Sequence, residues 1–129
     1  MKYNINIDYN RDKYLSEFGI ITLKDRYLVA GETSPQDGFA RAACAFADDE
    51  AHAQRLYDYA SKLWFMFSTP ILSNGGTDRG LPISCFLNHV EDSREGITGH
   101  YTENAFLSSV GGGIGGHWGA VRSVGSKTS

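Results

Sequence analysis

The sequence predicts an α/β protein in which a helical N-terminal region precedes the first strands of a parallel sheet. Apolar residues recur at helical spacing up to about residue 67, and beyond Pro70 short apolar stretches alternate with turns rich in Gly and Pro. The order strand, helix, strand that follows is typical of a parallel sheet. Only about two strands are predicted, whereas such a sheet needs further strands and cover on both faces. We therefore expect other polypeptide segments to complete it.

The composition limits the classes of function. The 129 residues are the length of one domain, with 41% hydrophobic and 21% charged residues. Lys and Arg number 12 and Asp and Glu 15, which gives a net charge of −3 and argues against a nucleic-acid partner. No stretch has the pattern of a signal peptide or the length of a membrane span. We expect a cytoplasmic protein with reduced cysteines and no membrane partner.

The first helices are predicted from apolar stripes and capping residues. Residues 11–28 predict two short helical pieces separated near Gly19. Thr33 or Ser34 is expected to cap the next helix, with Pro35 in its first turn, where a missing N–H is tolerated.

A longer helix is predicted over about residues 49–67. Asp48 and Asp49 stand where it would begin and favour its positive end. Its apolar residues recur at helical spacing, and Pro70 is placed to end it. We expect residues 1–68 to form the helical region and residues 69–129 to begin the sheet.

The second region contains a strand, a helix, a glycine-rich turn and a second strand. ISCFLNHV has the apolar character of a buried strand, and a helix is predicted from about residue 93 to 109. Glycines 111 to 119 then predict a turn, and HWGAVRSV a short strand.

Two cysteines differ in their surroundings. Cys85 lies beside Ser84 in an apolar strand and is either a buried core thiol or a thiol presented into a cleft. Cys44 lies in an alanine-rich amphipathic helix and is expected in the core. The histidines show no metal-ligand spacing with each other or with the cysteines, so no metal site is predicted.

The glycine cluster fits neither common nucleotide motif. It follows a predicted helix rather than a strand, unlike a dinucleotide fingerprint, and it lacks the Gly-Lys-Ser/Thr of a Walker A loop. Its backbone is expected to approach another segment, or a ligand's phosphate and sugar, closely. By themselves, Asp92 and Ser93 indicate a helix cap, and Thr69 a turn residue.

Five segments in this order resemble the catalytic large subunit of ribonucleotide reductase, class I type, over about residues 14–126. They are GIITLKDRYLV, ETSPQDGFARAACAFA, STPILSNGG, ISCFLNHVEDSREGI and SSVGGGIGGHWGAVRSVGS. The resemblance implies a ten-stranded α/β barrel, of which this chain holds the first strands. It also implies replacement of a ribonucleotide's 2′-hydroxyl by hydrogen, with two thiols supplying the electrons.

The resemblance assigns roles to particular residues. Cys85 would be the first of the two redox thiols, which reverses the reading of its local sequence. Residues at the substrate's phosphate and ribose would be Thr69, Ser84, Gly112 and Gly113. Residues of an allosteric site for a deoxynucleotide effector would be Asp92, Ser93 and Arg122, on a dimer helix over about residues 93–109.

The resemblance also predicts partners. The regulatory ATP-cone would precede residue 14, where there is no room for it, and the radical cysteine and second redox cysteine would follow residue 129. We expect the N-terminal fragment of a split subunit, from a split gene or an intein, inactive alone and binding no cofactor itself. Its partners would be the C-terminal fragment, a second large subunit, a radical-generating small subunit that contains metal, and a thioredoxin- or glutaredoxin-type reductant. The alternatives are a non-catalytic nucleotide-binding regulator and an interaction protein.

Overall fold

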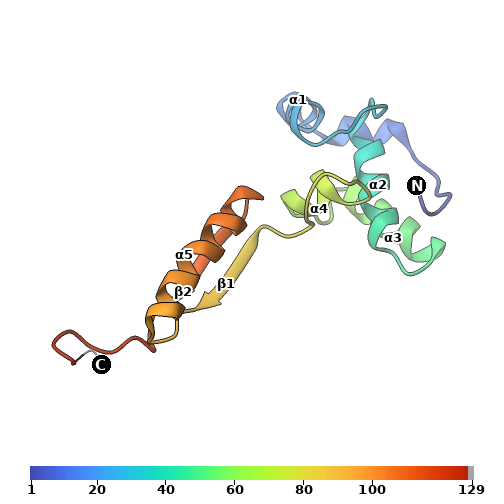
Figure 1. Cartoon of the computed structure of the whole chain (residues 1–129). Coiled ribbons are helices and arrows are strands. Elements are labelled where there is room, and N and C mark those ends of the chain that lie inside the picture. The colour runs from blue at the N-terminus through green and yellow to red at the C-terminus, as the bar shows by residue number, and fades with distance from the viewer. Residues whose placement is uncertain (128–129) are drawn as a thin grey trace. The chain divides into compact units, whose positions relative to one another are not determined.

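The computed structural model describes residues 1–127, which form two compact units (Figure 1). The first unit is Met1–Pro82 and the second begins at Ile83. Within the described residues, no helix is both long enough and apolar enough to cross a membrane.

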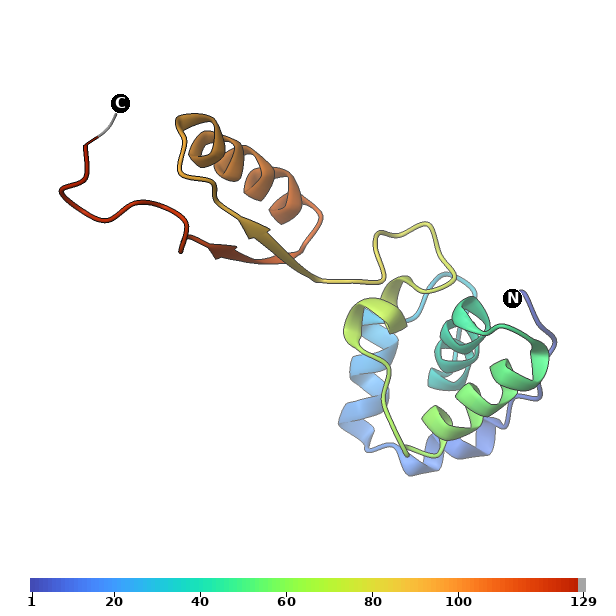
Figure 2. The same cartoon turned by 90° about the horizontal axis from the view of Figure 1, so that it is seen from below.

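The first unit is helical, as predicted, with α2 at its centre (Figure 2). Helix α2 contacts a 3-10 helix (η1) and three α-helices. The elements are η1 (Tyr9–Tyr14), α1 (Glu17–Arg26), α2 (Pro35–Phe46), α3 (Glu50–Ser61) and α4 (Thr69–Asn74).

The start of α2 confirms the capping prediction. Ser34 accepts a hydrogen bond from the N–H of Gln36, and Asp37 accepts from the N–H of Ser34, which forms a capping box with Pro35 in the first turn. The break expected near Gly19 is wrong. Helix α1 instead begins after Ser16, because the Ser16 hydroxyl accepts from the N–H of Gly19 and caps the helix three residues earlier.

Helix α3 ends at Ser61, earlier than the predicted residue 67. The N–H groups of Leu63 and Trp64 donate to the carbonyls of Ala60 and Tyr59, both at 2.9 Å, in a Schellman motif. Leu63 takes the left-handed conformation with φ of 61° and is the one non-glycine residue with positive φ among residues 1–127. For a leucine this conformation costs about 1–2 kcal/mol. Pro70 lies in the first turn of α4 instead of ending α3.

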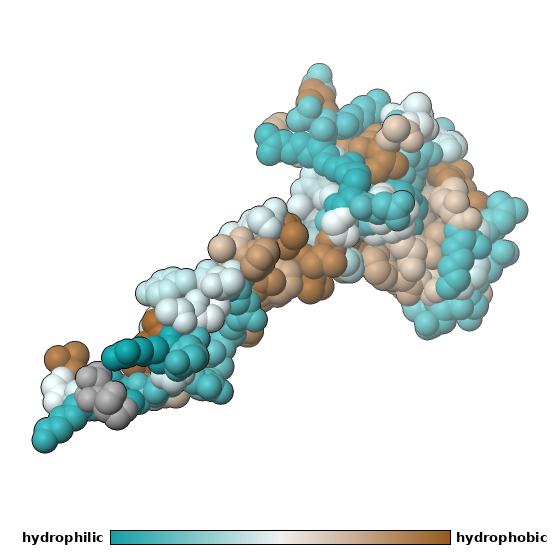
Figure 3. Space-filling model, viewed as in Figure 1, coloured by the Kyte–Doolittle hydropathy of each residue, from teal (hydrophilic) through white to brown (hydrophobic). Residues whose placement is uncertain are grey.

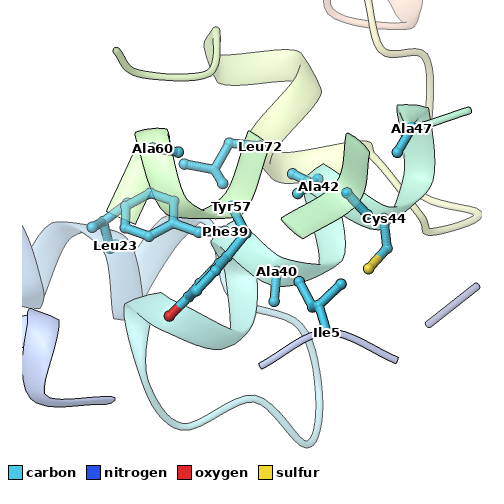
Figure 4. Close-up of a cluster of buried hydrophobic side chains, with 12 residues drawn as sticks. Ile5, Leu23, Phe39, Ala40, Ala42, Cys44, Ala47, Tyr57, Ala60 and Leu72 are labelled. Carbon is cyan, nitrogen blue, oxygen red and sulfur yellow. The ribbon is translucent and has the colours of Figure 1, made fainter. Parts of the chain in front are cut away.

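The core of the first unit lies between α2 and α3 (Figure 4). Phe39, Ala42 and Ala43 of α2 are fully buried, but Phe46 is 46% exposed at the end of the helix. The other buried apolar residues are Ile5, Leu23, Ala40, Cys44, Ala47, Ala53, Tyr57, Ala60 and Leu72.

Arg41 joins three parts of this unit. Its buried guanidinium pairs with Glu32, with Nε 2.7 Å from Oε1, and the two side chains are only 8% and 12% exposed. Its remaining N–H groups donate to three carbonyls at the C-terminal ends of helices: that of Tyr27 after α1, and those of Leu72 and Gly75 at the end of α4. One side chain therefore satisfies carbonyls that neither helix can satisfy internally.

The second unit contains a parallel β–α–β arrangement, which confirms the predicted order. Strand β1 (Cys85–His89) pairs with β2 (Gly113–His117), with Cys85 opposite Gly113, and α5 (Arg94–Ser109) connects them. The strand expected in HWGAVRSV lies instead within the glycine cluster. The cluster runs close beside β1: a side chain at Gly112 would collide with the ring of Phe86, and one at Gly115 would lie 2.9 Å from Leu87.

Replacing Arg41 with Met should lower the free energy of unfolding by about 3–5 kcal/mol, because Glu32 and three carbonyls lose a buried partner. Urea unfolding followed by circular dichroism measures this loss. The exposed Arg55→Met variant is the matched control and should unfold like the parent chain. Equal midpoints for both variants would contradict the role given to Arg41.

Candidate functional site

Cys85 lies exposed at the start of β1, on the sheet face away from α5. Side chains alternate along a strand, and Asn88 turns toward α5, donating to Glu103 Oε2 at 2.9 Å and Asn104 Oδ1 at 2.8 Å. Cys85, Leu87 and His89 therefore share the opposite face, where all three are exposed. The interpretation of Cys85 as a buried core thiol is wrong, and its thiol is open to a reactant.

Three of the four predicted substrate residues lie together around Cys85. The hydroxyl of Ser84 is 3.9 Å from its Sγ, and the N–H of Gly113 donates to the Ser84 carbonyl at 2.7 Å. Gly112 precedes Gly113 and packs on Phe86. The fourth, Thr69, lies in the first unit, where its hydroxyl is 3.3 Å from that of Tyr27.

Cys44 has the opposite environment. It lies in the core on α2, with an exposed fraction of 1%, and its thiol points to the carbonyl of Tyr3 at 3.7 Å. Desolvation raises the pKa of Cys44, which disfavours the reactive thiolate. The prediction that Cys44 is a core residue is confirmed.

The predicted effector residues converge in the second unit. Arg122 donates through Nε to Asp92 Oδ2 at 2.7 Å and through Nη1 to the Lys127 carbonyl at 2.7 Å. Ser93 caps α5 by accepting from the N–H of Gly96. A cavity of about 480 Å³, here called the Asp92–Arg122 cavity, is lined by Asp92, Ser93, Arg94, Glu95, Ile97, Val121 and Arg122. It combines both signs of charge with a helix N-terminus, a suitable setting for an anionic ligand that also carries hydroxyls.

A polar network in the second unit was missed by sequence reasoning. Asn88 donates to Asn104, the Asn104 amide lies 3.0 Å from His100 Nε2, and the rings of His100 and Trp118 pack edge to face with centroids 5.0 Å apart. This network ties α5 to β1. In the sequence, an asparagine stands inside an apolar strand, and His100 and Asn104 have the i,i+4 spacing that places two side chains on one face of a helix. Neither pattern identifies Asn88 as the partner of Asn104.

A larger cavity, of about 870 Å³, lies in the first unit. Two of its charged lining residues are already engaged: Arg41 by Glu32 and helix carbonyls, and Asp37 by the α2 cap. No group of three His, Cys, Asp or Glu residues within residues 1–127 could hold a metal ion.

Helices followed by a β–α–β unit define an α/β protein, and its second unit carries an exposed strand thiol beside a glycine-rich strand. Family models described as "Ribonucleotide reductase, all-alpha domain" and "Ribonucleotide reductase, barrel domain" match residues 13–80 and 83–129. This chain belongs to the ribonucleotide reductase large-subunit family, which confirms the resemblance found in the sequence.

Individual relatives agree. The ribonucleoside-diphosphate reductase large subunit of Invertebrate iridescent virus 6 is 46% identical over 112 residues, which are 87% of this chain and 12% of that protein. The alpha subunit of Helicobacter pylori strain 26695 is 36% identical over 95% of this chain and 17% of its own. The solved class Id alpha subunit of Actinobacillus ureae matches with a TM-score of 0.73 and 35% identity, over 94% of this chain and 23% of its own. The chain thus spans less than a quarter of these relatives.

In the native chain, iodoacetamide should alkylate Cys85 at least about tenfold faster than Cys44, because only Cys85 is exposed and burial raises the pKa of Cys44. Peptide mass spectrometry after timed quenching measures both rates. In urea the two rates should converge, and equal rates in the native chain would contradict the assigned environments.

Proposed function

We propose that this chain serves as the N-terminal part of a ribonucleoside-diphosphate reductase large subunit, in which the remaining barrel completes the catalytic site. The observation that carries the proposal is the exposed Cys85 thiol on β1, beside the glycine-rich β2. The small share of each relative that the chain spans supports the need for the rest of the barrel.

Cys85 is proposed to be one of two redox thiols. In the net reaction two thiols become a disulfide, the 2′-hydroxyl leaves as water, and the 2′-carbon gains a hydrogen, so two electrons pass to the nucleotide. Cys44 cannot be the second thiol, because it is buried in the core of the helical unit. The second thiol must therefore come from the remaining barrel.

The substrate is proposed to lie over the glycine-rich strand. Ser84 would bond its phosphate end, and Gly112 and Gly113 would let its ribose approach the backbone. The small residues beside the exposed thiol support this arrangement.

A deoxynucleotide effector is proposed for the Asp92–Arg122 cavity. Arg122 would contact its phosphates, while Asp92 and Ser93 would accept or donate hydrogen bonds at its sugar or base. A second large subunit against α5, a metal-containing small subunit that supplies the radical, and a thioredoxin- or glutaredoxin-type reductant complete the proposed assembly. Regeneration of a thiol pair suits a reducing compartment such as the cytoplasm.

Replacing Cys85 with Ser should abolish ribonucleotide reduction by the assembled enzyme, because a hydroxyl cannot form the product disulfide. The measurement is conversion of radiolabelled cytidine diphosphate by the complete large subunit together with its small subunit. Cys44→Ser is the control and should keep most of the activity, since Cys44 is buried. Full activity in the Cys85 variant would exclude its redox role.

A second candidate function is a nucleotide-binding regulator without chemistry. One observation favours it: residues of a single unit line the whole Asp92–Arg122 cavity, so an effector could bind without further barrel strands. Cys85→Ser would leave such a regulator unaffected.

Replacing Asp92 with Ala should weaken deoxynucleoside triphosphate binding by this chain about tenfold, because a charged hydrogen-bond acceptor is lost. Isothermal titration with a panel of these nucleotides measures the change. Asp25→Ala, at an exposed position of the first unit, should bind like the parent. Unchanged binding in the Asp92 variant would remove the cavity from the effector site.

A further inference from the structure

The segment that carries Arg122 is anchored on α5 by a contact between two aromatic rings. Trp118 follows β2 directly, and its ring packs edge to face on that of His100 in α5, with the ring planes 84° apart. We infer that Trp118 and His100 are positioning residues for the Asp92–Arg122 cavity. Their contact fixes the place of Arg122 relative to the start of α5. The inference rests on the proposed effector site, and neither residue lines the cavity itself.

The Asp92–Arg122 cavity has two walls that come from separate parts of the chain. One wall is formed by residues 92–95 and Ile97, at the start of α5, and the other by Val121 and Arg122, after β2. Groups that bind one ligand must be held in a fixed mutual geometry by the residues that support them. A residue that ties the second wall to α5 therefore affects the affinity of the cavity without touching the ligand.

Only a tight turn separates Trp118 from Arg122. The carbonyl of Trp118 accepts a hydrogen bond from the N–H of Val121 at 3.0 Å, and Arg122 follows this turn directly. The ion pair of Arg122 with Asp92 holds the other end of the turn, but its side chains are 39% and 32% exposed. Ion pairs this exposed stabilise a geometry only weakly, so the Trp118 ring is the stronger anchor of the turn.

His100 is a fixed base for the tryptophan ring. It is only 8% exposed, and its Nε2 lies 3.0 Å from the amide nitrogen of Asn104, which in turn accepts a hydrogen bond from Asn88 of β1. The Nδ1 atom of His100 is buried without a hydrogen-bond partner in the part of the chain that the structure describes. An unsatisfied buried polar atom lowers stability, so stability alone does not explain a histidine at this position.

Gly116 leaves the space that both rings occupy. A Cβ atom at this position would lie 2.7 Å from Cε1 of His100 and 3.1 Å from Nε1 of Trp118. A glycine within a strand is typical of such a close approach. Trp118 is 41% exposed, on a unit whose surface carries both hydrophobic and hydrophilic residues (Figure 3). The contact with His100, rather than complete burial, therefore holds the tryptophan ring.

The test measures binding of a panel of deoxynucleoside triphosphates to the chain by isothermal titration. Trp118→Leu should weaken binding at least about fivefold, because the turn before Arg122 loses its aromatic anchor. Trp118→Phe keeps an aromatic ring on His100 and should bind within about twofold of the parent. Trp64→Leu, at the other tryptophan of the chain, is 69% exposed in the first unit and is the control that should bind like the parent.

Two glycine variants test the same contact without removing either ring. Gly116→Ala should weaken binding as Trp118→Leu does, because the added methyl group displaces His100 or Trp118. Gly99→Ala is the matched control on α5, since a Cβ atom there would meet no other atom within 4 Å. It should bind like the parent.

A double-mutant cycle separates positioning from direct contact with the nucleotide. If Trp118 acts through Arg122, adding Trp118→Leu to Arg122→Gln should change the affinity by less than about twofold. Without any ligand, hydrogen exchange at the Val121 amide should be at least about fivefold faster in Trp118→Leu than in the parent. A tryptophan that only touches the nucleotide would not change this exchange.

Three results would overturn the inference. Equal binding by the parent, Trp118→Leu and Gly116→Ala would overturn it and leave the proposed effector site intact. An undiminished loss of affinity on adding Trp118→Leu to Arg122→Gln would make Trp118 a ligand contact rather than a positioning residue. Failure of the parent to bind any of the nucleotides would overturn the proposed effector site, and the inference with it.

Discussion

The buried pair between Arg41 and Glu32 is the constraint on which the first unit depends. The guanidinium donates at once to a carboxylate and to carbonyls at the ends of α1 and α4, which are far apart in sequence. An unpaired buried charge would be costly, so these helix ends are fixed relative to α2. Arg41 thereby helps to position α4, whose first residue, Thr69, also lies 3.3 Å from the hydroxyl of Tyr27.

The second unit depends on close approach of backbones. The glycines of and beside β2 leave room for the side chains of Phe86 and Leu87, so that β2 can pair closely with β1. The Cys85 thiol then lies on the exposed face of this two-stranded sheet. The β1–α5 turn and the segment after β2 then bring Asp92 to Arg122. Cys85 lies at the start of β1, and the Asp92–Arg122 ion pair lies beyond the C-terminal ends of both strands. A single β–α–β unit therefore carries both the proposed redox thiol and the proposed effector site.

Local chemistry made much of this predictable from the sequence. Ser34, Pro35 and Asp37 specify the start of α2 through neighbouring backbone groups, and the apolar run around Cys85 specifies β1. The early end of α3 was not predictable, because a leucine seldom adopts the left-handed conformation. Strand β2 was missed because glycine disfavours strands, and only its pairing with β1 overrides that preference. The carbonyl partners of Arg41 come from distant segments that no local pattern identifies.

The proposed role of Cys85 as one of two redox thiols requires that turnover leaves it in a disulfide. The most direct test is one turnover of the assembled enzyme without reductant, followed by mass spectrometry of its disulfides. We predict a disulfide between Cys85 and a cysteine of the remaining barrel, in proportion to the deoxynucleotide formed, with Cys44 still reduced. Product formed while Cys85 remains a free thiol would contradict it.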